Sequence, residues 1–362
     1  MLPKWFDKWN ADNPTNIYGP AILIGAIGAA VFVVALLVTW GQPFATTSLQ
    51  TGPRGTGMSV PEFKSDLAAG DPTAAGYLAR SGITEADTAA VSEAALANVP
   101  PALEGISPEA YAEMIVAMRS WTGIPDLMED PENYQTQVAY RMVAMVQSLN
   151  DEWGGHTNVS GEAGVNCYTC HRGQAVPNNI WFRIAPVNEN TAGWASVQNR
   201  VTPQSQYTSL PSDALESYLL DTQSIKVHDL DSRVDTQPGD PTWQNAERTF
   251  SLMNYFANSL GVNCVFCHNT RAFYDPAQVT PQWSTASLGI IMVQDLNTLH
   301  LVPLAEEGIL PENRLGPVYA DAPKAACATC HKGYQKPLGG MDMVSDWPEL
   351  ALVEPDFTAA TN

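Results

Sequence analysis

The chain is organised around the stretch Gly261-Val262-Asn263-Cys264-Val265-Phe266-Cys267-His268. The same pattern, Gly-Val-Asn-Cys-x-x-Cys-His, stands at Gly164–His171, and a third Cys-x-x-Cys-His ends at His331. Two thiols three residues apart can form thioethers with the two vinyl groups of one haem, and the imidazole that follows can ligate its iron. The motifs therefore predict three covalent haem c groups, attached to Cys167 and Cys170, to Cys264 and Cys267, and to Cys327 and Cys330.

These motifs use all six cysteines of the chain. Zinc sites or disulfides also use Cys-x-x-Cys pairs, but neither explains a histidine directly after each second cysteine. The expected proximal iron ligands are His171, His268 and His331. Because haem is attached to this motif outside the bacterial cytoplasmic membrane, we expect the haem-bearing part to be periplasmic.

The charge balance is strongly acidic, with 18 Lys and Arg against 38 Asp and Glu among 362 residues and a formal net charge of −20. Such a balance argues against binding of nucleic acid or anionic lipid, and it favours recognition of a basic partner. The stretch from Glu62 to Glu132 holds 13 acidic residues against Lys64, Arg80 and Arg119. We expect this stretch to steer a basic soluble cytochrome toward the haem of Cys167 and Cys170, although it could also be only a solvated face.

The N-terminal region contains no formally charged residue between Asp12 and Arg54, and the run from Ile17 to Trp40 is almost entirely apolar. About 20 such residues span a bilayer as a helix. A cleaved signal peptide is the alternative, but the run is longer than the usual ~7–15 apolar residues of one. We therefore expect residues 1–44 to be a retained anchor, with Lys4 and Lys8 on the cytoplasmic side.

The predicted fold is a mainly α-helical multihaem cytochrome c with one N-terminal transmembrane helix. It consists of two halves in which helix, turn and haem motif follow each other, joined by long irregular connections. The expected segments after the anchor are an extended arm (45–75), a first haem-bearing half (76–191), a connecting segment (192–241), a second haem-bearing half with two haems (242–345) and an acidic tail (346–362).

The distal iron ligands are less certain from the residues than the proximal ones. Met253, eleven residues before Cys264 on the helix that leads into that motif, is the candidate for the second haem. In the first half Met142 competes with Met145 one helical turn away, and Met142 is preferred. For the third motif the residues leave Met292, His300 and His156 open.

Several runs of the chain resemble the cytochrome subunit of photosynthetic reaction centres from purple bacteria. The quoted matches are Ala139-Tyr140-Arg141-Met142, Asn150-Asp151-Glu152-Trp153 with His156, Cys167-Tyr168-Thr169-Cys170-His171-Arg172-Gly173 and Asn179-Ile180-Trp181-Phe182. The likeness extends over residues 109–338 and includes the Cys264 and Cys327 motifs. In that family methionine ligands come from the helix before each motif, which implies Met142 and Met253. One haem there has two histidine ligands, which implies His156 paired with His331.

The chain departs from the family in one respect, because the usual members carry four haems. The first of these follows a methionine-bearing helix that corresponds here to residues 109–121. Where its Cys-x-x-Cys-His would stand, the sequence reads Thr122-Gly123-Ile124-Pro125-Asp126-Leu127-Met128. The resemblance thus implies a form that lacks the first haem, in which Met114 and Met118 pack a core. The family's common lipid-bearing N-terminal cysteine is also absent.

The expected function is electron transfer without bond chemistry on a substrate. The resemblance implies a membrane-anchored carrier that re-reduces the photo-oxidised bacteriochlorophyll special pair and accepts electrons from a soluble periplasmic donor. The implied partners are the reaction-centre membrane subunits that carry bacteriochlorophyll, a light-harvesting complex and a basic c-type cytochrome. A multihaem periplasmic enzyme of the peroxidase or nitrogen-oxide reductase type is the alternative, and it would require an iron with an open sixth position.

Overall fold

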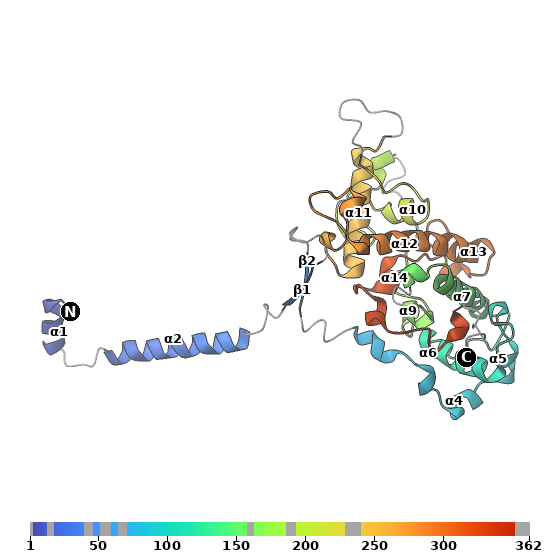
Figure 1. Ribbon diagram of the computed structural model, residues 1–362, viewed down its shortest axis with the longest axis horizontal. Helices are drawn as coiled ribbons and strands as arrows, with labels where there is room; N and C mark the ends of the chain where they lie inside the picture. Colours follow the sequence, from blue (N-terminus) through green and yellow to red (C-terminus); the bar gives the residue numbers. More distant parts are fainter. Residues whose placement is uncertain are drawn as a thin grey trace, which may run out of the picture. The chain divides into compact units, whose positions relative to one another are not determined.

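The computed structural model describes residues 3–12, 18–39, 46–50, 59–63, 71–157, 163–185, 193–228 and 240–351. The chain divides into two compact units, Met1–Leu49 with Pro61–Ala69, and Gln50–Val60 with Gly70–Asn362. The second of these, called the C-terminal unit below, carries all three motifs. Both units are mainly helical, as predicted (Figure 1).

The longer elements follow one another through the whole described chain. They are α1 (Lys4–Asp12), α2 (Tyr18–Thr39), β1 (Thr46–Gln50), β2 (Ser59–Phe63), α4 (Glu85–Ala89), α5 (Glu93–Ala97), α6 (Pro108–Thr122), α7 (Tyr134–Asp151), α8 (Gly154–Thr157), α9 (Cys167–His171), α10 (Ala214–Leu219), α11 (Trp243–Leu260), α12 (Pro281–Asp295), the π-helical turn η7 (Leu296–Leu301), α13 (Val302–Glu306) and α14 (Cys327–His331). The two strands pair with each other as a small sheet. Of the expected arm, residues 51–58 and 64–70 lie outside the described residues, as do residues 352–362 of the expected tail.

Helix α2 is apolar along its whole length, with a mean hydropathy of 2.9 and no buried residue. Its 22 residues rise about 33 Å at ~1.5 Å each, which is enough to cross a bilayer. The run Pro281–Glu306 also has the length and composition of a span, but it contributes Met292, Val293 and Leu304 to a buried core. By burial, α2 is the better anchor of the two.

The C-terminal unit contains two hydrophobic core clusters. The first gathers around α6 and includes Met114, Met118 and Trp121. The second gathers around α10, α11 and α12 and includes Leu215, Leu252 and Val293. Met145 on α7 packs against both clusters, so α7 joins the two halves of the unit.

The two halves share one way of packing a long helix against a haem motif. Helix α6 ends at Gly123 (φ 67°) and α11 ends at Gly261 (φ 64°), both in the left-handed conformation that glycine adopts without strain. A Cβ on Gly123 would lie 2.3 Å from the carbonyl oxygen of Gly173, and one on Gly261 would lie 2.1 Å from that of Gly333. Each glycine therefore lets its helix approach the backbone directly after a motif, α9 for α6 and α14 for α11.

The chain end returns to the first core cluster. Trp347 and Leu350 are fully buried, and the indole Nε1 of Trp347 donates to the hydroxyl of Tyr77 at 3.2 Å. The guanidinium of Arg80 lies 4.5 Å from the centroid of the Trp347 ring. The segment that we expected to be an acidic tail from residue 346 thus begins with core residues.

Candidate haem-binding sites

Two of the three motifs adopt the same local structure. Cys167–His171 and Cys327–His331 each form a one-turn helix, followed by Arg172 (φ 48°) and Lys332 (φ 51°) in the left-handed region. In such a turn both cysteines and the histidine project from one short segment, as attachment of one haem requires. The motif at Cys264 differs, because its residues Cys264–Phe266 form a 3₁₀ turn and Cys264 is exposed.

The α9 and α14 motifs open on one large cavity of about 880 Å³. This volume is at the upper end of the ~300–1,000 Å³ typical of ligand pockets. Cys167, Cys170, His171, Cys327, Cys330 and His331 all line the cavity. From the third motif only Phe266 and Cys267 reach it. The structure thus brings two of the predicted attachment sites together and places the third at the edge of the same space.

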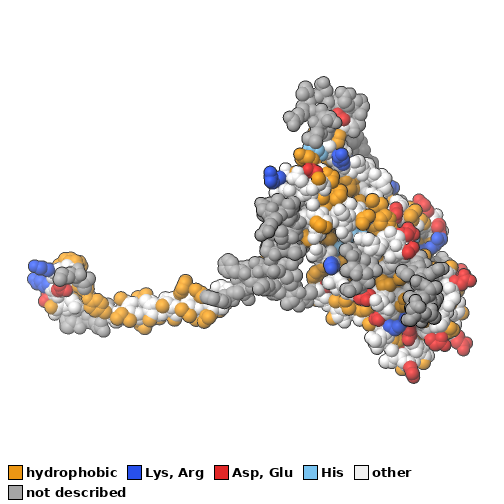
Figure 2. All heavy atoms as spheres, viewed as in Figure 1, with side chains coloured by type: hydrophobic (Ala, Val, Ile, Leu, Met, Phe, Trp, Pro, Cys, Tyr) orange, Lys and Arg blue, Asp and Glu red, His pale blue; other side chains and the backbone are white. Residues whose placement is uncertain are grey.

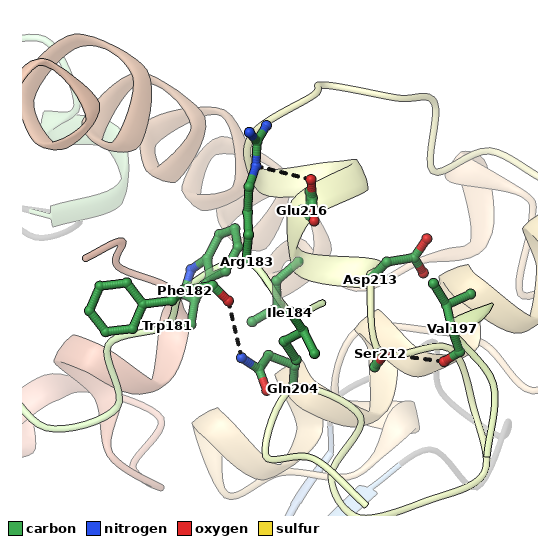
Figure 3. A pocket seen from close by; sticks show the side chains of 10 residues that line it. Trp181, Phe182, Arg183, Ile184, Val197, Gln204, Ser212, Asp213 and Glu216 are labelled. Carbon is green, nitrogen blue, oxygen red and sulfur yellow. Dashed lines mark hydrogen bonds and ion pairs between the residues drawn. The ribbon is translucent and has the colours of Figure 1, made fainter. Parts of the chain in front are cut away.

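A second cavity lies between Trp181, Arg183 and Glu216 (Figure 3). Its volume of about 10 Å³ is no more than a single water molecule needs. It is therefore too small for a cofactor.

All four histidines that we proposed as iron ligands hold their rings in the same way. In each, Nδ1–H donates to a backbone carbonyl, which leaves Nε2 free for a metal. The acceptors are Gln174 for His171 (2.8 Å), Phe273 for His268 (3.0 Å), Tyr334 for His331 (3.0 Å) and Thr285 for His156 (2.9 Å). This hydrogen bond is the outer-shell contact that usually fixes the tautomer of a metal-binding histidine.

Burial also keeps these imidazoles neutral. It lowers the pKa of His156, His171 and His268 from the ordinary value near 6.5, and that of His331 to about 4. Because only the neutral imidazole has a lone pair for iron, the four side chains are in the state that ligation needs at neutral pH.

The His156 and His331 rings face the cavity from two different halves of the unit. Their centroids are 6.2 Å apart, at an interplanar angle of 68°. A metal–imidazole bond is about 2 Å long and the ring centroid lies about 1 Å behind the nitrogen, so two imidazoles that share one metal have centroids about 6 Å apart. The spacing therefore fits a haem iron held between these two histidines.

Gly289 on α12 makes room for the His156 ring. A Cβ at this position would lie 2.5 Å from Cε1 of His156. Counted from the first residue of each helix, Gly289 in α12 occupies the same position as Met142 in α7, nine residues in. The second half thus carries a glycine where the first half carries the methionine, and an imidazole from the first half fills the space.

The methionine candidates differ in their surroundings. Met142 and Met145 both line the cavity, so the structure brings both within reach of the α9 motif. Met292 also lines it but is buried against the second core cluster. Met253 on α11 is partly buried in that cluster and does not line the described cavity. His300 is also outside the lining residues.

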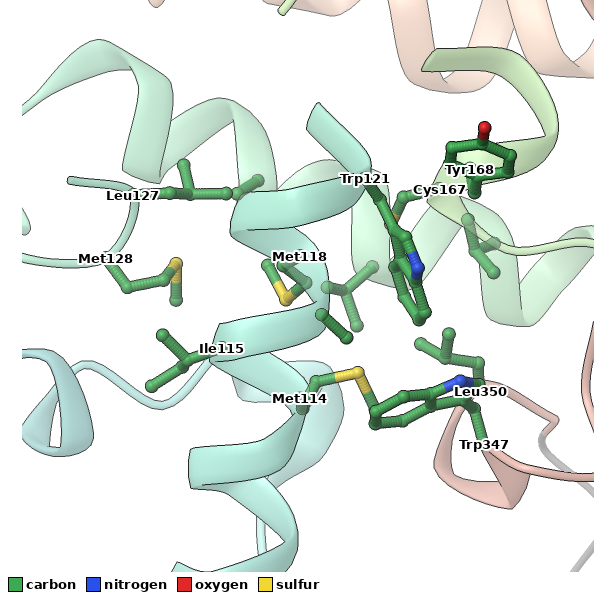
Figure 4. Packing of buried hydrophobic residues seen from close by; sticks show 14 of the residues in the cluster. Met114, Ile115, Met118, Trp121, Leu127, Met128, Cys167, Tyr168, Trp347 and Leu350 are labelled. Atoms are coloured by element: carbon green, nitrogen blue, oxygen red, sulfur yellow. The ribbon is translucent and has the colours of Figure 1, made fainter. Parts of the chain in front are cut away.

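The position of the lost motif is filled by protein. Gly123 and Gly261 occupy equivalent places, and three, six and seven residues after them the second half has Cys264, Cys267 and His268, whereas the first half has Asp126, Glu129 and Asp130. Eight residues before the glycine, Ile115 stands where the second half has Met253. Met114, Met118 and Trp121 are at most 2% exposed and pack with Trp347 (Figure 4).

Two functional features were missed at the sequence level. Gly289 offers a signal only after the two halves are aligned, because a glycine inside an apolar helix is otherwise unexplained. Trp347 stands in a segment of acidic composition, and nothing in its neighbourhood predicts that it fills a core 226 residues away from Trp121 in sequence.

Comparison with known proteins assigns the family. A sequence model of the photosynthetic reaction centre cytochrome C subunit matches residues 41–351. Proteins named photosynthetic reaction center cytochrome c subunit are similar along most of the chain. The one from Roseobacter denitrificans is 55% identical over 98% of this chain and 99% of its own, and the one from Rubrivivax gelatinosus is 33% identical over 91% and 90%. The subunit from Thermochromatium tepidum is 34% identical over 68% of this chain and 62% of its own. The chain therefore belongs to the photosynthetic reaction centre cytochrome c subunit family and is an electron-transfer protein with covalently bound haem c rather than an enzyme.

Proposed function

We propose that the chain carries three haems c, one on each cysteine pair. His171 with Met142, His268 with Met253, and His331 with His156 would provide the axial ligands. Support comes from the shared cavity of the α9 and α14 motifs and from the Nδ1–H bond that each of the four histidines donates to a carbonyl. Haem c supplies a reversible one-electron change at its iron, and a methionine ligand favours the reduced state more than a histidine does.

We further propose that the protein re-reduces the photo-oxidised bacteriochlorophyll pair and is itself reduced by a soluble periplasmic donor. Helix α2 would hold it in the photosynthetic membrane with the C-terminal unit on the periplasmic side, beside the reaction-centre subunits and a light-harvesting complex. The observation that carries this proposal is the closed arrangement of the His156–His331 site, where both axial positions are taken by protein. Such a site suits electron transfer and leaves no position for a substrate.

Flash spectroscopy on membranes tests the proposed role. After a flash oxidises the bacteriochlorophyll pair, absorbance of c-type haem should report oxidation with the same time course as the recovery of the pair. In a matched variant, Met253→His, the lower potential expected of a bis-histidine haem should alter this time course. Recovery of the pair with no change in haem absorbance would contradict the role.

The donor surface is proposed on the face that holds α4, α5 and the turn after α6, where Figure 2 shows acidic side chains gathered. Asp126 and Glu132 are exposed there. Glu129 differs from them, because it accepts from Arg119 at 2.5 Å and is bonded to Ser92, and the Ser92 bond is the main reason that its pKa is lowered. Asp126 and Glu132, rather than Glu129, are therefore the charges available to a basic cytochrome.

Charge reversal tests this surface. Asp126→Lys with Glu132→Lys should slow second-order reduction by a basic cytochrome about threefold to tenfold at low ionic strength. The difference should disappear near 1 M salt, where the Debye length is about 3 Å. The matched control is Glu306→Lys with Glu312→Lys, which makes the same charge change at exposed residues outside this face. Equal slowing by both pairs would show that only net charge matters.

A further inference from the structure

The residue after each of the α9 and α14 motifs reaches across to the other motif. Arg172 donates through Nη2 to the carbonyl oxygen of Cys330 at 3.0 Å. Lys332 donates through Nζ to the carbonyl oxygen of Cys170 at 2.8 Å. The two contacts are mirror images, since each joins the residue after one motif to the second cysteine of the other.

The second cysteines of the two motifs also face each other. The side chains of Cys170 and Cys330 are within hydrogen-bonding reach, and both are buried beneath the crossed contacts. These are attachment points for two different haems in the proposed function, on which this inference rests. The guanidinium and the ammonium therefore lie between two haem sites, against the backbone of both.

The two cations are compensated unequally. Arg172 bonds through Nη1 to the carboxylate of Asp71 at 2.5 Å and to the hydroxyl of Thr73 at 2.7 Å. The side chains of this pair are only 5% and 1% exposed. Within the described part of the chain no carboxylate oxygen lies within 4.0 Å of Lys332 Nζ. The Arg172–Asp71 pair is thus close to neutral, whereas Lys332 leaves one positive charge at this junction.

A cation in a poorly solvated place favours whichever nearby state has less positive charge. A haem iron carries one positive charge less when it is reduced. We propose that Lys332 is a tuning residue that raises the reduction potential of the haem on Cys167 and Cys170, whose second cysteine it contacts. The Arg172–Asp71 pair then holds the junction together with little effect on the potential.

Redox titration of the purified holoprotein, with each haem followed by its own absorption band, tests the role of Lys332. Lys332→Gln keeps a donor for the Cys170 carbonyl but removes the charge. It should reduce the equilibrium constant for reduction of the Cys167–Cys170 haem about tenfold, which is ~59 mV for one electron. Lys332→Arg keeps a permanent cation and should restore most of the shift. The control Lys226→Gln makes the same charge change at an exposed loop residue and should leave the potential within a small fraction of that shift.

The buried pair provides a second, independent arm. Asp71→Asn frees the charge of Arg172 and should raise the potential of the same haem, while Asp71→Asn combined with Arg172→Gln removes both charges and should return it close to wild type. An unchanged potential in both Lys332→Gln and Asp71→Asn, or an equal shift in Lys226→Gln, would overturn the proposal. Haem content of each sample is measured alongside, because a missing haem at Cys167 and Cys170 in the wild-type protein would instead refute the proposed function.

Discussion

Helix α6 with the segment after it and helix α11 with the segment after it are two versions of one structural unit. Both helices end at a left-handed glycine that touches the backbone behind a haem motif, at Gly173 for α6 and at Gly333 for α11. After α11 the chain continues into Cys264-Val265-Phe266-Cys267-His268, whereas after α6 it continues into residues without cysteine or histidine. The backbone arrangement is thus the same with and without a motif.

The difference shows what can fill the place of a porphyrin. Around α6 the methionines, Trp121 and the returning Trp347 form a dry core, with the Trp121 and Trp347 rings 5.0 Å apart and nearly perpendicular. Around α11, Met253 and the motif at Cys264 are less enclosed. Closed packing of side chains in one half therefore corresponds to a proposed cofactor site in the other.

The strongest test of this comparison replaces the two glycines in parallel. Gly123→Ala and Gly261→Ala should each lower the free energy of unfolding by about 2–4 kcal/mol, because a side chain is strained at positive φ and its Cβ would also overlap a carbonyl oxygen. Thermal or denaturant unfolding of the holoprotein measures both effects. Gly105→Ala is the control, since φ there is also positive (89°) but no atom lies within 4 Å of the added Cβ. A large effect at one glycine and none at the other would show that the two halves do not share the packing.

A second test separates methionine as core from methionine as ligand. Met114→Ala should cost about 2–5 kcal/mol of stability, because its side chain is fully buried, and it should leave every haem spectrum unchanged. Met253→Ala should cost less stability but convert one haem to a high-spin, carbon-monoxide-reactive form, since its sixth position would be opened. Carbon monoxide difference spectra of the two variants, with the wild type as reference, distinguish the two roles. Carbon monoxide binding by the wild type itself would favour an enzyme-like open site.

A finer test concerns the glycine that faces His156. Gly289→Ala should displace the imidazole, because the added Cβ would lie 2.5 Å from Cε1. The spectrum and potential of the haem on Cys327 and Cys330 should then change while the other two stay as they are. Gly155→Ala, beside His156 but with its nearest neighbour at an ordinary 3.4 Å, is the control. If Gly289→Ala left all three spectra untouched, Met292 would become the better candidate for the ligand.

The sequence predicts the helical class and the motifs well, because both depend on local pattern. Helix α6 follows from Pro108 at its first turn and Gly123 at its end, and α11 from the Thr242 cap and Gly261. The crossing of Arg172 and Lys332, the Asp71 pair and the burial of Trp347 depend on contacts between distant segments. Spacing along the chain carries no information on these contacts, and the choice between Met142 and Met145 stays open for the same reason, since both line the cavity.

The number and place of the haems test the account most directly. Mass spectrometry of the intact protein and of its proteolytic peptides should find three covalent haems per chain, one each on the peptides with Cys167 and Cys170, Cys264 and Cys267, and Cys327 and Cys330. A peptide spanning residues 122–133 should carry none. A fourth haem, or a cysteine pair that carries no haem in the folded protein, would contradict the account.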